Sequence, residues 1–162
     1  MERKARITRN TSETKITLEL NLDGSGQGKI RTGIGFFDHM LNSFARHGCF
    51  DLTLEVEGDL EVDTHHTVED VGIVLGQAIA QAVGDKKGIA RYGFQILPMD
   101  ESLVLCALDL FGRPCLGFAM EVDRARGGAF ASDMVREYFD AVSFGAMLVR
   151  LVWRSEGVSL PL

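Results

Sequence analysis

The feature that most constrains the fold is one order of hydrophobic patterns that occurs twice along the 162-residue chain. In the first part, apolar residues alternate over 16–22 and 52–56, which is typical of strands with one buried face. They recur at three- and four-residue spacing over 36–44, which is typical of an amphipathic helix. The predicted elements are a hairpin of strands 16–22 and 28–32, a helix from 36 to 48, strands at 52–56 and 60–62, and a helix over 65–83.

The second part repeats the order hairpin, helix, strand. The predicted elements are a hairpin of strands 102–110 and 114–122, a helix over 130–144 and a strand over 147–153. A shift of 98 residues aligns Glu137 with His39, each near the start of its helix. We therefore predict one α+β domain over 1–162, made of two repeats, 1–92 and 93–162, in which a mixed sheet packs on helices and the second repeat lacks its last helix.

The acidic balance of the chain argues against a nucleic-acid partner. The formal net charge is -6, whereas affinity for nucleic acid comes from neutralising phosphates with basic residues. No apolar run approaches the roughly 20 residues of a membrane helix, and the N-terminal residues lack the apolar core of a signal peptide. We expect a cytoplasmic protein with no membrane partner, and the charge leaves room for a small anionic substrate held by a few arginines.

The run Asp-Thr-His-His-Thr-Val-Glu-Asp at 63–70 has the donor types and spacing of a transition-metal site. On a helix each residue advances about 100°, so Glu69 shares a face with His65 and with His66, while the two imidazoles diverge. The two imidazoles could bind two different metal ions, or one could bind an ion while the other faces a neighbouring subunit. Imidazoles with a carboxylate favour Mn, Fe, Zn, Co or Ni over Mg or Ca. We expect Asp63 and Asp70 to orient the imidazoles.

The alternative is a solvated histidine pair at a helix start, with Thr64 or Asp63 as the N-cap residue. All four histidines of the chain fall between His39 and His66, close to acidic residues, and this concentration favours a metal site. His47 lies near a predicted helix end and is interpreted as a residue that interacts with the helix dipole.

Further motifs resemble one enzyme family. The longest are Thr-Gly-Ile-Gly-Phe-Phe-Asp-His-Met-Leu at 32–41 and the histidine run at 63–70. Shorter ones are Arg-Asn-Thr-Ser-Glu-Thr (9–14), Leu-Asp-Gly-Ser-Gly (22–26), Lys-Gly-Ile-Ala-Arg-Tyr-Gly (87–93), Pro-Met-Asp-Glu-Ser (98–102) and Leu-Asp-Leu-Phe-Gly-Arg-Pro (108–114). In this order they resemble imidazoleglycerol-phosphate dehydratase, an enzyme family of histidine biosynthesis, over residues 3 to about 147.

The resemblance implies a duplicated split β/α fold, like domain 2 of ribosomal protein S5, in trimers that assemble into a homo-oligomer of 24 subunits. It implies loss of water from imidazole glycerol phosphate to give imidazole acetol phosphate, with two Mn²⁺ ions per site at subunit interfaces. By matching position it implies that the metal ligands are His39, His65, His66 and Glu69, with Glu137 as a weaker match. It implies that Glu13, Arg91 and Arg113 contact the substrate. It also implies that Glu69 or Asp100 transfers a proton.

The residue types suit that reaction. A metal ion supplies a Lewis acid and an orienting template, and a carboxylate can move a proton. The planar guanidinium of arginine pairs with phosphate oxygens through charge-assisted hydrogen bonds. Without the resemblance, Arg91 and Arg113 would be interpreted as solvated loop residues.

The chain departs from the family pattern near its C-terminus. The family has a second His-His-x-x-Glu on a last helix, followed by a lysine, and this sequence has neither. Arg150 stands where the family has a histidine, and residues 154–162 show no family pattern. A truncated or frame-altered chain of this kind is expected to expose an apolar face of its second repeat, to bind metal weakly and to show little dehydratase activity alone.

Three other functions stay open. The first is a catalytically inactive member of the family, or a subunit that needs a complementing chain. The number of metal ions bound per chain separates these two from a complete enzyme. The second is a metal-dependent hydrolase that activates water with the single histidine cluster. A nucleic-acid-binding module is the least favoured, because of the acidic charge.

Overall fold

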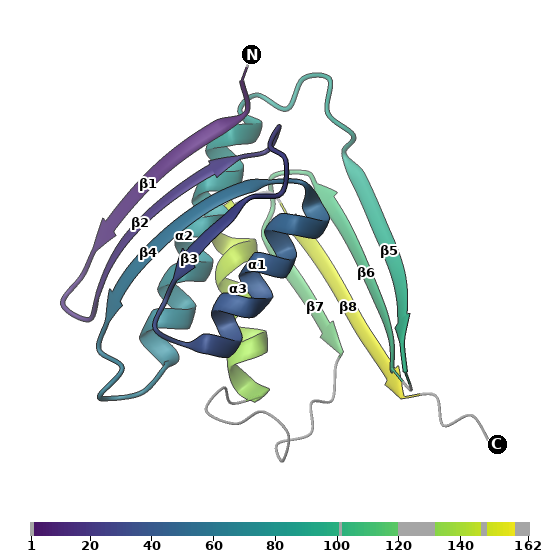
Figure 1. Ribbon diagram of the computed structural model, residues 1–162. Coiled ribbons are helices and arrows are strands. Elements are labelled where there is room, and N and C mark those ends of the chain that lie inside the picture. The colour runs from purple at the N-terminus through teal and green to yellow at the C-terminus, as the bar shows by residue number, and fades with distance from the viewer. Residues whose placement is uncertain (1, 101, 120–131, 147–148, 158–162) are drawn as a thin grey trace.

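Two four-stranded sheets enclose a layer of helices (Figure 1). The computed structural model describes residues 2–100, 102–119, 132–146 and 149–157. The elements in chain order are β1 (Lys4–Asn10), β2 (Thr14–Asn21), β3 (Gly28–Arg31), α1 (Gly35–Gly48), β4 (Asp51–Gly58), α2 (His65–Val83), β5 (Tyr92–Met99), β6 (Ser102–Leu110), β7 (Cys115–Ala119), α3 (Ser132–Ala146) and β8 (Val149–Gly157). We call β1–β4 the first sheet and β5–β8 the second sheet.

The two sheets have the same strand order. It is β1-β2-β4-β3 in the first sheet and β5-β6-β8-β7 in the second. In each sheet the last pair is parallel and the other two pairs are antiparallel. The predicted hairpins of 16–22 with 28–32 and of 102–110 with 114–122 are therefore wrong, because β4 and β8 lie between the expected partners. The α+β class is confirmed.

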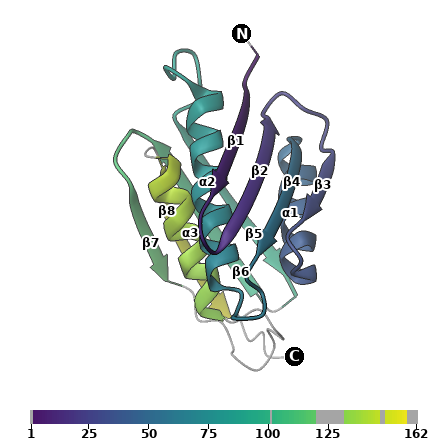
Figure 2. The ribbon, with the colours of Figure 1, turned by 90° about the vertical axis from the view of Figure 1, so that its left-hand side faces the viewer.

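The helices occupy the space between the sheets. In the first sheet α2 packs on β1 and β2, and α1 packs on β3 and β4. In the second sheet α3 packs on β7 and β8, and within the described residues no helix packs on β5. Figure 2 shows α2 and α3 side by side, and they form the main contact between the two halves of the molecule.

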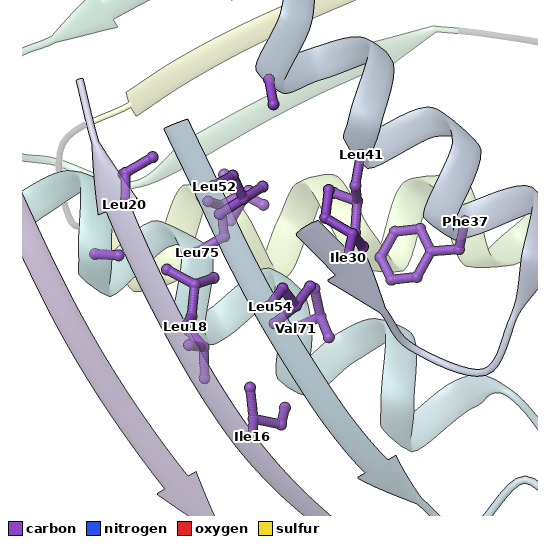
Figure 3. Close-up of a cluster of buried hydrophobic side chains, with 14 of the residues drawn as sticks. Ile16, Leu18, Leu20, Ile30, Phe37, Leu41, Leu52, Leu54, Val71 and Leu75 are labelled. Carbon is purple, nitrogen blue, oxygen red and sulfur yellow. The ribbon is translucent and has the colours of Figure 1, made fainter. Parts of the chain in front are cut away.

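Alternating apolar residues build the core beneath the first sheet. Every second residue along the centre of β2 and β4 is fully buried, and those between are exposed or partly exposed. Burying one such aliphatic side chain contributes about 1.5–3 kcal/mol, so this face holds the first sheet on its helices. The buried residues labelled in Figure 3 include Ile16, Leu18, Leu20, Leu52 and Leu54 of the strands and Val71 and Leu75 of α2.

Glycines let α2 and α3 approach each other closely. A Cβ atom at Gly76 would lie 2.4 Å from the carbonyl oxygen of Val142, and one at Gly145 would lie 2.4 Å from the carbonyl oxygen of Ile73. Both distances are well below van der Waals contact, so any side chain there would push the helices apart. The junction between the two halves therefore depends on these two glycines.

Other boundaries differ from the predictions. The predicted strand at 60–62 is a turn, in which the Val62 N–H donates to the carbonyl of Asp59. The edge strands β1 and β5 were not predicted, and β8 continues to Gly157. Residues 120–122, 130–131 and 147–148 of the predicted elements lie outside the described residues. The division of the chain into repeats at residue 92 stays a prediction. None of the helices described is both long and apolar enough to cross a membrane.

Candidate active site

The histidine pair lies at the first turn of α2. The chain leaves β4 at Gly58 and turns before the helix begins. Thr64 occupies the N-cap position without a side-chain cap bond, and the backbone N–H of His65 donates to Oδ1 of Asp63 at 2.7 Å. Asp63 thus stabilises the helix start, while the His65 and His66 side chains stay 38% and 42% exposed.

His65 and Glu69 face each other across one helical turn. Nε2 of His65 lies 3.7 Å from Oε2 of Glu69. The ring centroids of His65 and His66 are 5.9 Å apart and their planes are inclined by 78°. The two imidazoles thus have different partners: Glu69 forms a close pair with His65, and His66 pairs with another carboxylate.

The partner of His66 is Asp59, which was not among the predicted site residues. Nδ1 of His66 lies 2.8 Å from Oδ2 of Asp59, whose side chain is 18% exposed. The hydrogen bond to Asp59 raises the pKa of the His66 imidazole, although partial desolvation opposes the shift. With Nδ1 held in this way, Nε2 is the nitrogen left for a further ligand.

Asp63 and Asp70 do not orient the imidazoles as predicted. Asp63 accepts the backbone N–H of His65, as described above. Asp70 is buried and pairs with Arg9 at 2.9 Å, and it also accepts a hydrogen bond from the hydroxyl of Thr14. A buried carboxylate needs such partners, and here they tie the β1–β2 connection to α2. The expectation failed because the Asp70 carboxylate is buried and bound by Arg9 and Thr14.

Glu13 lies in the β1–β2 connection, which brings it close to Asp59 and His66. Its backbone carbonyl accepts the N–H of Asp59 at 3.1 Å, and its carboxylate accepts a hydrogen bond from the Ser12 hydroxyl at 2.6 Å. The Ser12 bond lowers the pKa of the Glu13 carboxyl, and the charge of His66 contributes in the same direction. The structure therefore brings together His66, Asp59 and Glu13 at one end of the first sheet.

The predicted ligands His39 and Glu137 and the predicted catalytic residue Asp100 do not join this group. His39 is exposed on α1, and the carboxylate of its neighbour Asp38 accepts hydrogen bonds from the backbone and hydroxyl of Thr32. Glu137 is half-buried on α3, and Asp100 lies in the β5–β6 turn with a positive φ of 51°. Among the described residues, no three His, Cys, Asp or Glu side chains gather closely enough to hold a metal ion.

The two predicted phosphate-binding arginines are brought together around one ring. The guanidinium carbons of Arg91 and Arg113 lie 4.2 Å and 4.8 Å from the centroid of Phe111. Arg91 also forms a two-pronged ion pair with Asp109, at 2.6 Å and 3.0 Å. Stacking on an aromatic face and pairing with a carboxylate fix a guanidinium in one orientation.

The histidines and the arginines lie at opposite ends of the molecule. In Figure 1, the β1–β2, β4–α2 and β5–β6 connections are at one end, and the α2–β5 and β6–β7 connections are at the other. We call these the histidine end (Glu13, His65, His66, Glu69, Asp100) and the arginine end (Arg91, Arg113). Nine residues of β6 span the two ends, and at about 3.3 Å per residue this is about 30 Å. A small substrate cannot reach both ends of one chain.

Fold and site together define a duplicated α+β protein with a histidine–carboxylate cluster and a separate arginine pair. Comparison with known proteins makes the class more specific. The family model described as imidazoleglycerol-phosphate dehydratase matches residues 32–157. The chain is 60% identical over 146 residues to the imidazoleglycerol-phosphate dehydratase of Acetivibrio thermocellus, covering 90% of this chain and 75% of that protein. It is 52% identical over 157 residues to that of Dinoroseobacter shibae, covering 97% and 80%.

Solved structures agree with the sequence relatives. The crystal structure of imidazoleglycerol-phosphate dehydratase from Staphylococcus aureus superposes with a TM-score of 0.82 at 33% identity, covering 96% of this chain and 86% of that chain. That of the Pyrococcus furiosus protein, in complex with (S)-C348, gives 0.80 at 29% identity, covering 93% and 80%. The chain belongs to the imidazoleglycerol-phosphate dehydratase family, whose members are lyases of histidine biosynthesis.

Proposed function

We propose that this chain dehydrates imidazole glycerol phosphate to imidazole acetol phosphate with Mn²⁺ as its cofactor. The observation that carries the proposal is the pairing of His65 with Glu69 beside a second imidazole, His66, that Asp59 holds by Nδ1. This presents two nitrogen donors and a carboxylate at one end of the chain. The sequence relatives favour the same reaction, because all those described above are named imidazoleglycerol-phosphate dehydratases.

The donor chemistry fits a divalent transition metal. The 3.7 Å separation of His65 Nε2 and Glu69 Oε2 lets one cation contact both, and His66 offers Nε2 in another direction. Imidazole and carboxylate donors suit Mn²⁺, which when bound supplies a Lewis acid and a template for the substrate. Since the described residues of one chain contain no three-donor group, we propose that further ligands, His39 and Glu137 among them, come from neighbouring copies.

The chain's own side chains have the following proposed roles. Glu69 or Asp100 moves the proton that leaves the substrate carbon. Glu13, whose carboxyl pKa is lowered by Ser12, is a charged acceptor for a substrate hydroxyl or ring N–H. Arg91 and Arg113 bind the phosphate through charge-assisted hydrogen bonds, with Phe111 holding both guanidinium groups.

The site we propose needs more than one copy of the chain. The histidine end and the arginine end are about 30 Å apart along β6, while the substrate is a small molecule. A homo-oligomer that places the arginine end of one copy against the histidine end of another would complete the site. We propose such an assembly in the cytoplasm, with trimers and 24 subunits as the form to test first.

Metal content and turnover, measured together, test the proposal. The purified chain is loaded with Mn²⁺, its metal content is determined by elemental analysis, and formation of imidazole acetol phosphate is followed. We expect Mn²⁺-dependent product formation that is lost in His66→Ala, at a low rate because the four histidines include no second cluster. About two ions per chain would support a complete enzyme. A metal content near zero without product would identify a non-catalytic member of the family.

A further inference from the structure

Asp70 is a buried residue of α2 that directly follows Glu69 in the sequence. Its side chain is 10% exposed, and both of its carboxylate oxygens have partners. Oδ1 lies 3.0 Å from Nε and 2.9 Å from Nη2 of Arg9, and Oδ2 accepts a hydrogen bond from the hydroxyl of Thr14. Arg9 belongs to β1 and Thr14 begins β2. One carboxylate of α2 therefore binds both strands that the β1–β2 connection joins.

The threonine hydroxyls extend this contact into the β1–β2 connection. The hydroxyl oxygens of Thr11 and Thr14 are 3.2 Å apart, and because Thr14 donates its proton to Asp70, Thr11 is the donor in this pair. The Thr11 oxygen also lies 3.5 Å from Oδ2 of Asp70. It accepts the backbone N–H of Thr14 at 2.9 Å and that of Glu13 at 3.2 Å. A chain of hydrogen bonds thus runs from the backbone of Glu13 to the carboxylate of Asp70.

The backbone of Glu13 is also held on its other side. Its carbonyl accepts the N–H of Asp59, and the carboxylate of Asp59 holds His66 by Nδ1. The N–H of Glu13 is bound to Thr11, so both of its backbone polar groups are fixed. Its side chain is exposed to solvent. A backbone held at both groups restricts where this exposed carboxylate can lie relative to His66.

We propose that Asp70 is a positioning residue that acts through the two threonines to hold Glu13 in a fixed place relative to the metal donors of α2. The ion pair with Arg9 would by itself join β1 to α2, whereas the threonine contacts add a hold on the connection that carries Glu13. Asp70 and Glu69 are neighbours on one helix, so the anchor of Glu13 and a proposed metal ligand move together. The inference rests on the proposed function, in which Glu13 contacts the substrate.

Amide hydrogen exchange of the metal-free chain tests the anchoring step. Asp70→Asn leaves one acceptor oxygen where the carboxylate has two, so the side chain can no longer accept from both Arg9 and Thr14. We expect the amides of Thr14 and Asp59 to exchange at least about 10-fold faster, as in a local opening. The amide of Leu18, in the centre of β2, should stay protected.

Three further variants make this result specific. Thr14→Val removes the hydroxyl while keeping the ion pair with Arg9, and it should have the same effect even if Asp70→Asn does not fold. Thr14→Ser keeps the hydroxyl and should restore slow exchange. Asp51→Asn is the matched control: its carboxylate binds backbone N–H groups of the β2–β3 connection, at the other end of the first sheet, and its loss should leave both amides unchanged.

Separate titrations of Mn²⁺ and of imidazole glycerol phosphate test the functional step. A hydrogen bond to a charged group is worth about 10- to 100-fold in affinity, so Thr14→Val should weaken substrate binding by up to this factor. Its Mn²⁺ affinity should stay unchanged, because the metal donors keep their places. Glu13→Gln combined with Thr14→Val should bind substrate no more weakly than Glu13→Gln alone, since both substitutions act on one contact.

The possible failures are distinguishable. Unchanged amide exchange in Asp70→Asn and Thr14→Val would overturn the role of Asp70, and so would additive losses in the double variant or equal losses of Mn²⁺ and substrate affinity. A wild-type chain that binds no substrate would overturn the proposed function, and with it the functional step of this inference, even where amide exchange responds as expected.

Discussion

The two sheets of this molecule share a strand order and differ on both faces. The first sheet is covered on its inner face by α1 and α2 and is polar outside. The second sheet is covered by α3 alone among the described helices, and its outer face carries Phe94 at 79% exposure. The contrast shows that one strand order is compatible with a polar outer face and with an apolar one. The histidines lie on α1 and α2, and the stacked arginines lie in the connections next to β5 and β6.

The largest expected effect concerns the metal donors of the first half. Glu69→Ala removes the carboxylate that lies 3.7 Å from His65. Loss of an outer-shell partner costs about 10- to 100-fold in metal affinity, so loss of this ligand is expected to weaken Mn²⁺ binding more than about 100-fold. Calorimetric titration of Mn²⁺ measures the change. Glu57→Ala, which removes an exposed carboxylate paired with Lys15, is the control, and equal losses in both variants would refute the site.

Asp59→Asn should weaken Mn²⁺ binding by about 10- to 100-fold, because it removes the acceptor that orients His66. In the metal-free chain, the same substitution should change the stability of the fold in a pH-dependent way. The Asp59 hydrogen bond raises the pKa of His66 above its ordinary value of about 6.5, so the stabilisation it provides is complete below that pH and is lost as pH rises through the folded-state pKa.

Urea unfolding of the metal-free wild-type chain and Asp59→Asn at several pH values measures this second effect. The difference in stability should be largest in mild acid and should shrink toward alkaline pH. A difference that grows with pH would have the wrong sign and would mean that Asp59 does not stabilise protonated His66.

The junction of the two halves is tested by Gly76→Ala. The added Cβ would lie 2.4 Å from a carbonyl oxygen of α3, and overpacking of this kind costs about 1–3 kcal/mol of unfolding free energy. Gly35→Ala is the matched control, because a Cβ there meets no atom within 4 Å. Chemical denaturation of both variants measures the effect. If Gly76→Ala were as stable as the control, close contact of α2 and α3 would not hold the halves together.

The smallest effect is expected from the ion pair of the second half. Asp109→Asn breaks the ion pair with Arg91. The Asp109 side chain is 25% exposed and the Arg91 side chain is 42% exposed. Partly exposed pairs of this kind contribute about 1 kcal/mol or less, so the urea midpoint should shift only slightly. A loss of several kcal/mol would show that the arginine end is part of the structural core.

Prediction from the sequence succeeded where one strand face is fully buried. Residues such as Leu18 and Leu54 alternate with polar neighbours, so β2 and β4 were identified correctly. β5 was missed although Tyr92, Phe94 and Ile96 alternate with Gly93 and Gln95, and these three apolar side chains are exposed in the structure. The hairpins were wrong because a turn signal shows where the chain reverses and does not show which strand lies next to it.

The site was predicted in part for a similar reason. Helical spacing correctly placed Glu69 beside His65, because that geometry is local. Asp59 and the arginine pair depend on contacts across turns and between strands. Phe111, which brings Arg91 and Arg113 together, was not singled out, although it stands in the Leu-Phe-Gly-Arg-Pro motif between them.

The central claim, that one site combines the histidine end of one copy with the arginine end of another, is tested most directly by mixing two variants. One variant carries His66→Ala, and the other carries both Arg91→Ala and Arg113→Ala. Each variant by itself is expected to lose Mn²⁺-dependent binding of imidazole glycerol phosphate. When equal amounts are dissociated and reassembled together, about a quarter of the wild-type binding sites should return, because each end is intact in half of the copies. No recovery in the mixture, under conditions in which the wild-type chain binds, would contradict the account.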